Sequence, residues 1–482
     1  MQDGERSVRQ VTQKRDVAKR NVLVALLVTM VVGASGFAAY AWHPTISPIE
    51  PPEIGSFDPA LVRRGAELAA IGNCNVCHTK PGGEVFAGGL AVPTPFGTVY
   101  STNITPDAQT GIGRWSEEAF GRSMRAGLDR EGRHLYPAFP YDHFTRVTDA
   151  DNRALYAFLM TRESVMARAP ENDLPFPLNQ RWVLAGWKLL FFREGGASLD
   201  DVVAQDPIWQ RGAYLTEGLG HCGACHTPRN AFGAERGDAH FAGGEAEGWT
   251  AYALNIDSPA AIPWTEESMA IYLRQGWHER HGIARGSMAP VVGNLASVPE
   301  DDTRAIARYV VSQMGQPSAE RQQRAVSALE RAGGDGAGAH PASADSQTVA
   351  APPRNKAGAD IYAAACATCH EARRPLPFGG LHLSLSTGIT GPTPQNLLNV
   401  VLNGLPASSG ERAPIMPGFR GTLDGEQLAA LVQYLRTEFS GRPAWDGVEE
   451  AVQAARERDH NRAVSSRPIV TSRSAPADLA QP

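Results

Sequence analysis

The chain has no cysteine outside one short pattern. Its 482 residues contain six cysteines, and all six lie in three copies of C-x-x-C-H. The copies are CNVCH at 74–78, CGACH at 222–226 and CATCH at 366–370. The sequence also contains no P-loop and no G-x-G-x-x-G stretch that opens a strand-turn-helix unit. No sequence element therefore suggests a nucleotide cofactor, and every thiol has to be explained by the repeated pattern.

An excess of positive charge is absent as well. The formal net charge is −6, and residues 1–20 carry six basic residues against three acidic ones, so the remaining chain carries −9. An acidic body argues against nucleic acid as a partner. It is compatible with a protein partner that docks through a basic face.

The C-x-x-C-H pattern has the spacing of covalent haem attachment. The two thiols can each form a thioether with a haem vinyl group, and the next residue, histidine, can reach the iron. A zinc site would need two more Cys or His ligands for each ion, and a C-x-x-C redox centre needs no adjacent histidine. The motifs predict three covalently attached haem c groups, with thioethers at Cys74, Cys77, Cys222, Cys225, Cys366 and Cys369 and proximal ligands at His78, His226 and His370.

The amino terminus predicts export. No charged residue occurs from Asn21 through Trp42, and this run is long enough to cross about 30 Å of hydrocarbon as a helix. We expect a cytoplasmic basic segment at 1–20 and a transmembrane anchor at 21–42, with the haem domains on the periplasmic side of a bacterial inner membrane. A cleavable signal peptide is the alternative, because AYA at 39–41 resembles a cleavage site.

The rest of the chain repeats one helical plan three times. A helical pattern leads into each haem motif (PALVRRGAELAAIGN, PIWQRGAYLTEGLGH and KAGADIYAAACAT), and a later helix at 151–159, 302–310 and 427–435 carries an aromatic residue next to last. We expect an all-α fold, with three tandem class I-type cytochrome c domains after an N-terminal transmembrane helix. The predicted domain limits are 55–196, 197–316 and 354–440.

The segments between these domains differ in composition. Residues 43–54 are rich in proline and predict an extended stalk. Residues 317–353 predict a flexible linker, and residues 441–482 predict a disordered tail. The aromatic insertion at 178–192 suits a helix that packs between domains, and it also suits contact with the membrane surface or a partner subunit.

Methionine is a common second axial ligand of haem c. The loop before the last helix offers Met288 in RGSMAPVV and Met416 in RAPIMPGF. Core packing is the alternative role for both side chains. Their placement between prolines and glycines at matching positions of two repeats favours ligation.

The first unit breaks this pattern. Its loop, HLYPAFPYDHF, has Phe139 where methionine is expected, and phenylalanine cannot bind iron. Either that iron has an open sixth position, or a residue nearby supplies the ligand. We rank His143 first because it lies in the same loop, and we retain His134 and Met124 as further candidates. A surface or propionate contact is the alternative role for His143.

Four strings carry a family resemblance: GNCNVCHT, YSTNITPDAQTGIGRWSEEAF, RGAYLTEGLGHCGACHTPRNAFG and MPGFRGTLDGEQLAALVQYLR. They resemble the triple-haem cytochrome c subunits of membrane-bound bacterial dehydrogenases, the alcohol and gluconate dehydrogenase cytochrome family, over residues of about 55 to 440. In that family the loop at 101–107 and its counterpart around Asn255 lie against the haem, which implies a propionate contact for Asn103. The family's usual LYPAMPY is here LYPAFPY. LYPAFPYDHF looks more like the cytochromes that accompany molybdenum hydroxylases acting on aldehydes, nicotinate or isoquinoline.

Two functions from different classes follow. The first is a non-catalytic electron-transfer subunit, which receives electrons from a catalytic dehydrogenase and passes them to quinone or a terminal oxidase of the respiratory chain. The partner is then a molybdenum hydroxylase with an iron-sulfur subunit, or a flavin- or PQQ-dependent alcohol or gluconate dehydrogenase. The second is a haem peroxidase or oxidase with an open site at the first haem, for which His143 or His134 is the candidate acid-base group.

Overall fold

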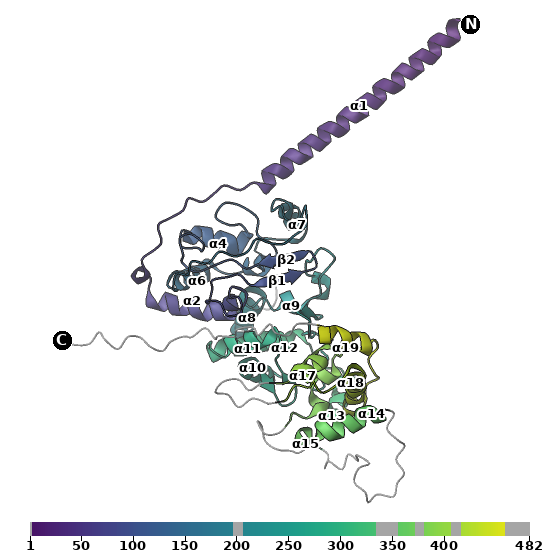
Figure 1. Cartoon of the computed structure of the whole chain (residues 1–482). Helices are drawn as coiled ribbons and strands as arrows, with labels where there is room; N and C mark the ends of the chain where they lie inside the picture. Colours follow the sequence, from purple (N-terminus) through teal and green to yellow (C-terminus); the bar gives the residue numbers. More distant parts are fainter. Residues whose placement is uncertain (1, 196–205, 334–354, 372–379, 406–415, 458–482) are drawn as a thin grey trace, which may run out of the picture.

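The computed structural model describes residues 2–195, 206–333, 355–371, 380–405 and 416–457. Its first element, α1 (Gln2–Ala41), is one helix that projects from the body of the molecule (Figure 1). Within it, Lys19–Ala41 forms a 23-residue stretch apolar enough to cross a membrane. The predicted apolar segment is therefore helical, and the basic residues before it continue the same helix.

Beyond α1, three helical units follow one plan, in which a first helix leads into C-x-x-C-H and a long closing helix packs on the first. The first unit holds η1 (Ile54–Ser56), α2 (Pro59–Ile71), α3 (Cys74–Cys77), α4 (Glu117–Ala126), α5 (Tyr141–Phe144) and α6 (Asp149–Met160), followed by α7 (Val183–Phe191). The second holds α8 (Pro207–Tyr214), a π-helical turn η2 (Leu215–Leu219), α9 (Gly223–His226), η3 (Gly237–Ala239), α10 (Glu266–Gln275), α11 (Met288–Leu295) and α12 (Glu300–Gln313), followed by α13 (Ala319–Gly333). The third holds α14 (Lys356–Ala365), α15 (Ala367–His370), η4 (Leu383–Leu385), α16 (Thr387–Thr390), α17 (Gln395–Asn403), α18 (Gly425–Ser440) and α19 (Val448–Glu457).

Local sequence signals fix where these helices begin. In α2 and α8 an aspartate caps the helix and proline occupies its first turn: Asp58 accepts from the N–H of Ala60, and Asp206 accepts from that of Ile208. Ser116 and Thr265 cap α4 and α10 in the same way, as the sequence pattern predicts. The first helix and the middle helix of the repeat are therefore set by residues that lie next to them in the chain.

A glycine in the first helix lets the closing helix approach closely in every unit. A Cβ at that glycine would fall far inside the contact distance of a backbone carbonyl oxygen on the closing helix, next to the aromatic residue that marks each closing helix in the sequence. The distance from this added Cβ to the carbonyl oxygen is 1.9 Å for Gly65 and Ala154, 1.9 Å for Gly212 and Ala305, and 2.3 Å for Gly358 and Ala430. The neighbouring aromatic residues are Phe158, Tyr309 and Tyr434. The three units thus share one helix crossing in which only glycine fits.

The fold contains a little β structure in addition to the helices. Three antiparallel strand pairs occur among the described residues: β1 (Ala91–Thr94) with β2 (Gly97–Tyr100), β3 (Gly244–Ala246) with β4 (Trp249–Ala251), and β5 (Trp277–His278) with β6 (Gly282–Ile283). These pairs lie in loops between helices. The expected all-α class is therefore correct for the core elements and omits these short hairpins.

The first two units form one body, and the third has its own core. A single cluster of buried apolar side chains runs from α2 and α6 of the first unit to α8 and α12 of the second. A separate cluster gathers Tyr362, Leu398 and Val432 with other side chains of the third unit. The chain is consequently organised as a pair of units plus one.

Residues 319–333 correct the prediction of a flexible linker over 317–353. They form α13, whose Ala325 and Ala328 are buried with Ile262 of the second unit and Leu385 of the third. Small apolar residues on one face of a helix can pack between two bodies, and composition alone did not reveal this face. The remaining linker residues, 334–353, lie outside the described residues.

Two further expectations about connecting segments change. Residues 441–457 are folded, because Trp445, Val448 and Val452 are buried in the core of the third unit; the rest of the predicted tail lies outside the described residues. The predicted stalk is extended but attached, since the N–H groups of Ile46 and Ile49 donate to carbonyl groups of the first unit.

Candidate haem-binding sites

The histidines of the three motifs are held in the same way. Nδ1 of His78 lies 2.6 Å from the carbonyl oxygen of Thr102, that of His226 lies 2.6 Å from Tyr252, and that of His370 lies 2.9 Å from Leu381. A carbonyl can only accept, so each Nδ1 carries the proton and each Nε2 keeps its lone pair for a metal. Burial lowers the pKa of all three imidazoles, which favours this neutral form.

The six cysteines occur as free thiols beside these histidines. Burial raises the pKa of Cys74 and Cys222 to about 12 and that of Cys77 and Cys366 to about 11. A redox-active dithiol requires the opposite shift, toward the ionised sulfur. The surroundings of these thiols suit conversion to neutral thioethers.

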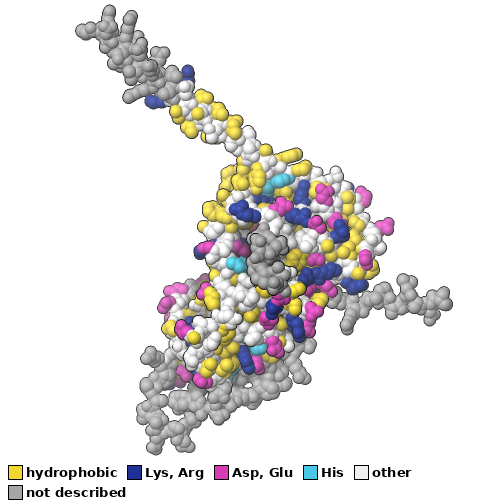
Figure 2. All heavy atoms as spheres, turned by 180° about the vertical axis from the view of Figure 1, so that it is seen from behind, with side chains coloured by type: hydrophobic (Ala, Val, Ile, Leu, Met, Phe, Trp, Pro, Cys, Tyr) yellow, Lys and Arg dark blue, Asp and Glu magenta, His cyan; other side chains and the backbone are white. Residues whose placement is uncertain are grey.

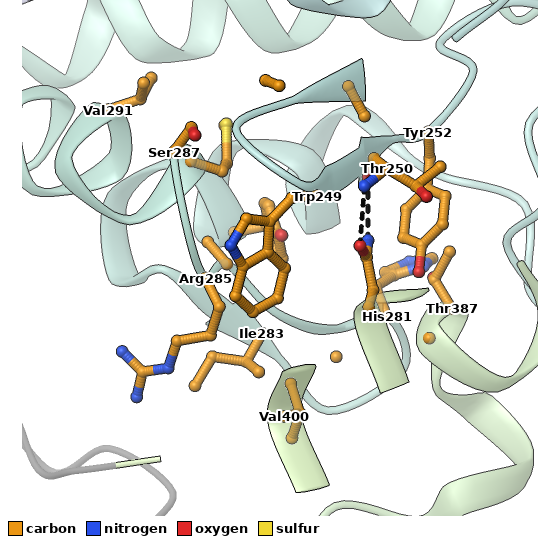
Figure 3. A pocket seen from close by; sticks show the side chains of 18 of the residues that line it. Trp249, Thr250, Tyr252, His281, Ile283, Arg285, Ser287, Val291, Thr387 and Val400 are labelled. Atoms are coloured by element: carbon orange, nitrogen blue, oxygen red, sulfur yellow. Dashed lines mark hydrogen bonds between the residues drawn. The ribbon is translucent and has the colours of Figure 1, made fainter. Parts of the chain in front are cut away.

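A cavity of about 530 Å³ lies against the second and third motifs. Its walls include Cys222, Cys225, His226 and Met288 from the second unit, and Cys366, Cys369, His370 and Met416 from the third. Figure 3 shows Trp249 and Ile283 of the second unit on the same cavity as Val400 of the third. Each predicted pair of histidine and methionine therefore borders one apolar space, as a haem with two axial ligands requires.

Hydrogen bonds hold the two sides of this cavity together. The side chain of Asn396 accepts from the N–H of Thr250 (2.8 Å) and donates to the Thr250 carbonyl (2.9 Å); both bonds are the dashed lines at Thr250 in Figure 3. The amide of Asn399 donates to the carbonyl of Gly248 at 3.0 Å. Helix α17 of the third unit is thus hydrogen-bonded to β4 and to the residue before it, and these bonds join two walls of the cavity.

The first motif lies next to the second. Cys77 borders the same cavity as Cys225, and burial, helped by the carboxylate of Glu247, raises the pKa of both thiols. The first and second attachment motifs therefore lie on the same cavity. No local sequence pattern indicates that these two motifs border one cavity.

A buried asparagine cluster fixes this proximity. Asn294, on the helix that begins with Met288, donates from its amide to the Oδ1 atoms of Asn73 and Asn75, both at 2.9 Å. All three asparagine side chains are buried. Asn73 and Asn75 flank Cys74, so the cluster joins the first haem motif to the helix of the second unit's predicted ligand.

The structure corrects the first-ranked ligand of the first haem. His143 is buried, and both of its ring nitrogens are engaged: Nδ1 with the carbonyl of Glu217 (2.8 Å) and Nε2 with Oε1 of Glu235 (2.9 Å). Both partners belong to the second unit, so His143 joins the units instead of facing its own motif. Nε2 of His134 donates to the carbonyl of Ala41 at 3.0 Å, at the end of α1.

The amide group of Asn103, predicted to contact a haem propionate, donates its hydrogen bonds to the protein instead. Its amide donates to the carbonyl of Val165 (2.7 Å) and to the hydroxyl of Thr110 (3.0 Å), and its Oδ1 accepts from the N–H of Thr105 (2.9 Å). Asn255, its counterpart, makes the same turn by accepting from the N–H of Asp257 at 2.9 Å. Both asparagines shape the loop that supplies the carbonyl for the proximal histidine.

Sequence reasoning missed several residues that position the sites. The asparagine cluster and the partners of His143 join residues far apart in the chain, and no local pattern marks them. The glycines of the helix crossings did have a signal. Each precedes alanine in the first helix of its unit, so an alignment of the three helices identifies Gly65, Gly212 and Gly358.

An apolar cavity bordered by motif cysteines and by histidines with a free Nε2 fits a macrocycle held through thioethers, and it defines a c-type cytochrome. In agreement, the family model described as cytochrome C oxidase, cbb3-type, subunit III matches residues 353–435. The chain is 38% identical over 403 residues to the gluconate 2-dehydrogenase cytochrome c subunit of Pantoea cypripedii, covering 78% of this chain and 85% of the relative. It is 35% identical over 402 residues to the cytochrome c subunit of the quinone alcohol dehydrogenase of Gluconobacter oxydans, covering 79% and 78%.

The chain therefore belongs to the family of cytochrome c subunits of dehydrogenases, which are electron-transfer subunits. It is also 44% identical over 414 residues to a subunit of the nicotinate dehydrogenase of Pseudomonas putida. That match covers 85% of this chain and 33% of the relative, so the chain spans a third of the length of that protein. The family predicted from the sequence motifs is confirmed.

Proposed function

We propose that the chain carries three covalently attached haem c groups, one in each unit, and transfers electrons from a membrane-associated dehydrogenase to quinone or a terminal oxidase. The observation that carries this proposal is the threefold arrangement of the motif histidines, each with Nδ1 bonded to a backbone carbonyl. Three identical arrangements support three equivalent cofactors. The proposal assigns no bond-breaking chemistry to the chain itself.

Bound haem supplies reversible one-electron chemistry at its iron. In each unit the backbone carbonyl orients the proximal imidazole, and the two cysteines fix the macrocycle next to it. Met288 and Met416 border the cavity and supply soft thioether ligands, which raise the reduction potential relative to histidine. The apolar walls exclude water and favour the less charged, reduced state.

The order of the haem groups follows from which sites adjoin. Cys77 of the first motif lies close to Cys225 of the second, and the second and third motifs border a common cavity. This arrangement supports a path in which the second haem exchanges electrons with both others. Electrons then enter at one end of the series and leave at the other.

The dehydrogenase partner that we propose is a molybdenum hydroxylase. The resemblance of LYPAFPYDHF to cytochromes of that branch supports it, and so does the identity with the nicotinate dehydrogenase subunit, which exceeds that with the gluconate or alcohol dehydrogenase subunits. A flavin- or PQQ-dependent alcohol or gluconate dehydrogenase is the second candidate, because the chain covers far more of those two relatives' own length.

We further propose that the first unit sits on the periplasmic surface of the inner membrane. Helix α7 packs on α1, with the rings of Phe37 and Trp182 at 6.3 Å between centroids. Leu189 and Leu190 of α7 are exposed, and Figure 2 shows hydrophobic side chains gathered where α1 meets the body. An apolar surface next to a membrane-spanning helix is suited to contact with lipid.

The test of the proposed function is purification of the complex from its native membrane with mild detergent. Co-purifying subunits are identified, and the complex is analysed for molybdenum, flavin and quinone cofactor. Molybdenum with an iron-sulfur subunit is the expected result. A flavin or quinoprotein partner would move the chain to the second candidate, and fewer than three haem groups per chain would contradict the electron path.

A further inference from the structure

The first unit has no methionine at the position that Met288 holds in the second, although the two loops begin with the same hydrogen bonds. The N–H of Leu135 donates to the carbonyl of Gly127 (2.8 Å), as that of Ala284 donates to Gly276 (2.7 Å). Leu128 forms an antiparallel β-bridge with His134, and the corresponding residues of the second unit, Trp277 and Ile283, form an antiparallel strand pair. Counting from the two glycines without a gap places Phe139 at the position of Met288.

Phe139 takes part in packing. Its ring lies 5.2 Å from that of Phe144, in an edge-on arrangement, and it contacts the core of the first two units. Both ring nitrogens of His143 bind groups of the second unit, and His134 binds the end of α1. Both histidines of this loop are thus engaged elsewhere, and a protein ligand for the first iron would come from another element.

The described part of the first unit contains three methionines outside this loop. Their exposure and their counterparts in the second unit indicate which of them can face a haem. Met166 is 73% exposed. Met160 corresponds to Val311 in α12, which does not border the cavity of the second unit. Met160 is thus a core residue, and Met166 lies on the surface.

Met124, the third of these, has a different counterpart. Helices α4 and α10 both begin with a Glu-Glu pair, have equal lengths and end at a glycine with positive φ, which aligns Met124 with Leu273. Leu273 borders the cavity beside His226 and Met288, and both side chains are 6% exposed. By this correspondence Met124, a buried core residue, occupies in the first unit the position that lines the cavity in the second, with a thioether in place of the leucine side chain.

We propose that Met124 supplies the sixth ligand of the first haem, on the premise of the proposed function that a haem is attached at Cys74 and Cys77. A thioether on an unbranched chain with three rotatable bonds can reach a position that leucine cannot, and sulfur is a soft ligand suited to haem iron. The first unit lacks a methionine where the second has Met288, because it has Phe139 there. It has a methionine, Met124, where the second has Leu273, and this second difference restores a thioether ligand. All three haem groups then have one histidine and one methionine.

The experiment is spectroscopy of the full chain, purified with its haem groups and compared with Met124→Leu, which restores the residue of the second unit and nearly preserves volume. The wild-type protein is expected to show the methionine-to-iron charge-transfer band at an intensity of three haems, and to bind no carbon monoxide rapidly. Met124→Leu is expected to lose a third of that band and to bind carbon monoxide at one haem. Met160→Leu, in the same core, is the matched control and leaves the spectrum unchanged.

The outcomes separate this inference from the proposed function. The pyridine haemochrome assay gives the haem content: fewer than three haems in the wild-type protein would contradict the proposed function, not the role of Met124. Three haems with a band of only two in the wild-type protein would overturn the role of Met124. An unchanged band in Met124→Leu would overturn it as well. If that variant does not fold, Met124→His is expected to change the methionine band by the same third while keeping every haem low-spin.

Discussion

Replacing Gly212 by alanine tests whether the helix crossing sets the geometry of the second haem site. The new Cβ would lie 1.9 Å from the carbonyl oxygen of Ala305, a backbone atom, so α8 and α12 have to separate by about 1 Å. Overpacking of this kind costs about 3 kcal/mol, and the better helix propensity of alanine returns about 1 kcal/mol. We expect a net loss of about 2 kcal/mol, which lowers the Tm of the first two units by roughly 5 °C.

The measurement is thermal unfolding of the holoprotein in detergent, monitored through the circular dichroism of the haem absorption bands. Gly121→Ala is the matched control, because Gly121 also lies within a helix but a Cβ there meets no atom within 4 Å. The control should raise the Tm slightly. If Gly212→Ala raised the Tm as much as the control, the close crossing and the reasoning built on it would be refuted.

Three further predictions concern the contacts between units and the ligands. Asn294→Leu removes the buried amide that donates to Oδ1 of Asn73 and should cost about 1–3 kcal/mol, seen as a lower urea midpoint; an unchanged midpoint would contradict the stabilising role of the asparagine cluster. For His143, burial lowers the pKa, but the hydrogen bond and charge of Glu235 outweigh this and raise it above 6.5, so its stabilising contribution is present below pH 6.5 and is lost as pH rises through the raised value. The Tm difference between wild type and His143→Gln should accordingly shrink on going to alkaline pH, and a constant difference would exclude this linkage. Met416→Ala should lower the potential of one haem in a redox titration and leave three haems by the haemochrome assay, whereas loss of a haem would assign Met416 a structural role.

The sequence was sufficient for the elements whose causes are local. Apolar periodicity and the caps at Ser116 and Thr265 predicted the helices, and the motif spacing indicated which histidines stand next to pairs of thiols. Met288 and Met416, expected from their matching positions to be axial ligands, border the same cavity as His226 and His370, and ligation itself stays a prediction. Each of these depends on residues within one unit.

The sequence was insufficient where the cause is a contact between units. His143 is a plausible ligand by sequence because it is four residues from Phe139, yet its partner Glu235 lies 92 residues away. The asparagines that meet Asn294 lie 219 and 221 residues away. Composition predicts a linker in place of α13 because the buried face of this helix, around Ala325 and Ala328, is made of small residues that are equally common in loops.

The separate core of the third unit has a consequence for how such chains diverge. Since the first two units close one shared core and are joined through Asn294, a mutation that exchanged either of them alone would leave buried polar and apolar groups without partners. The third unit buries its own aromatic and aliphatic side chains and meets the second mainly through α13 and α17. Recombination between genes could therefore exchange the third unit without disturbing the core of the first two, provided that the new unit kept the α17 contacts that close the shared cavity.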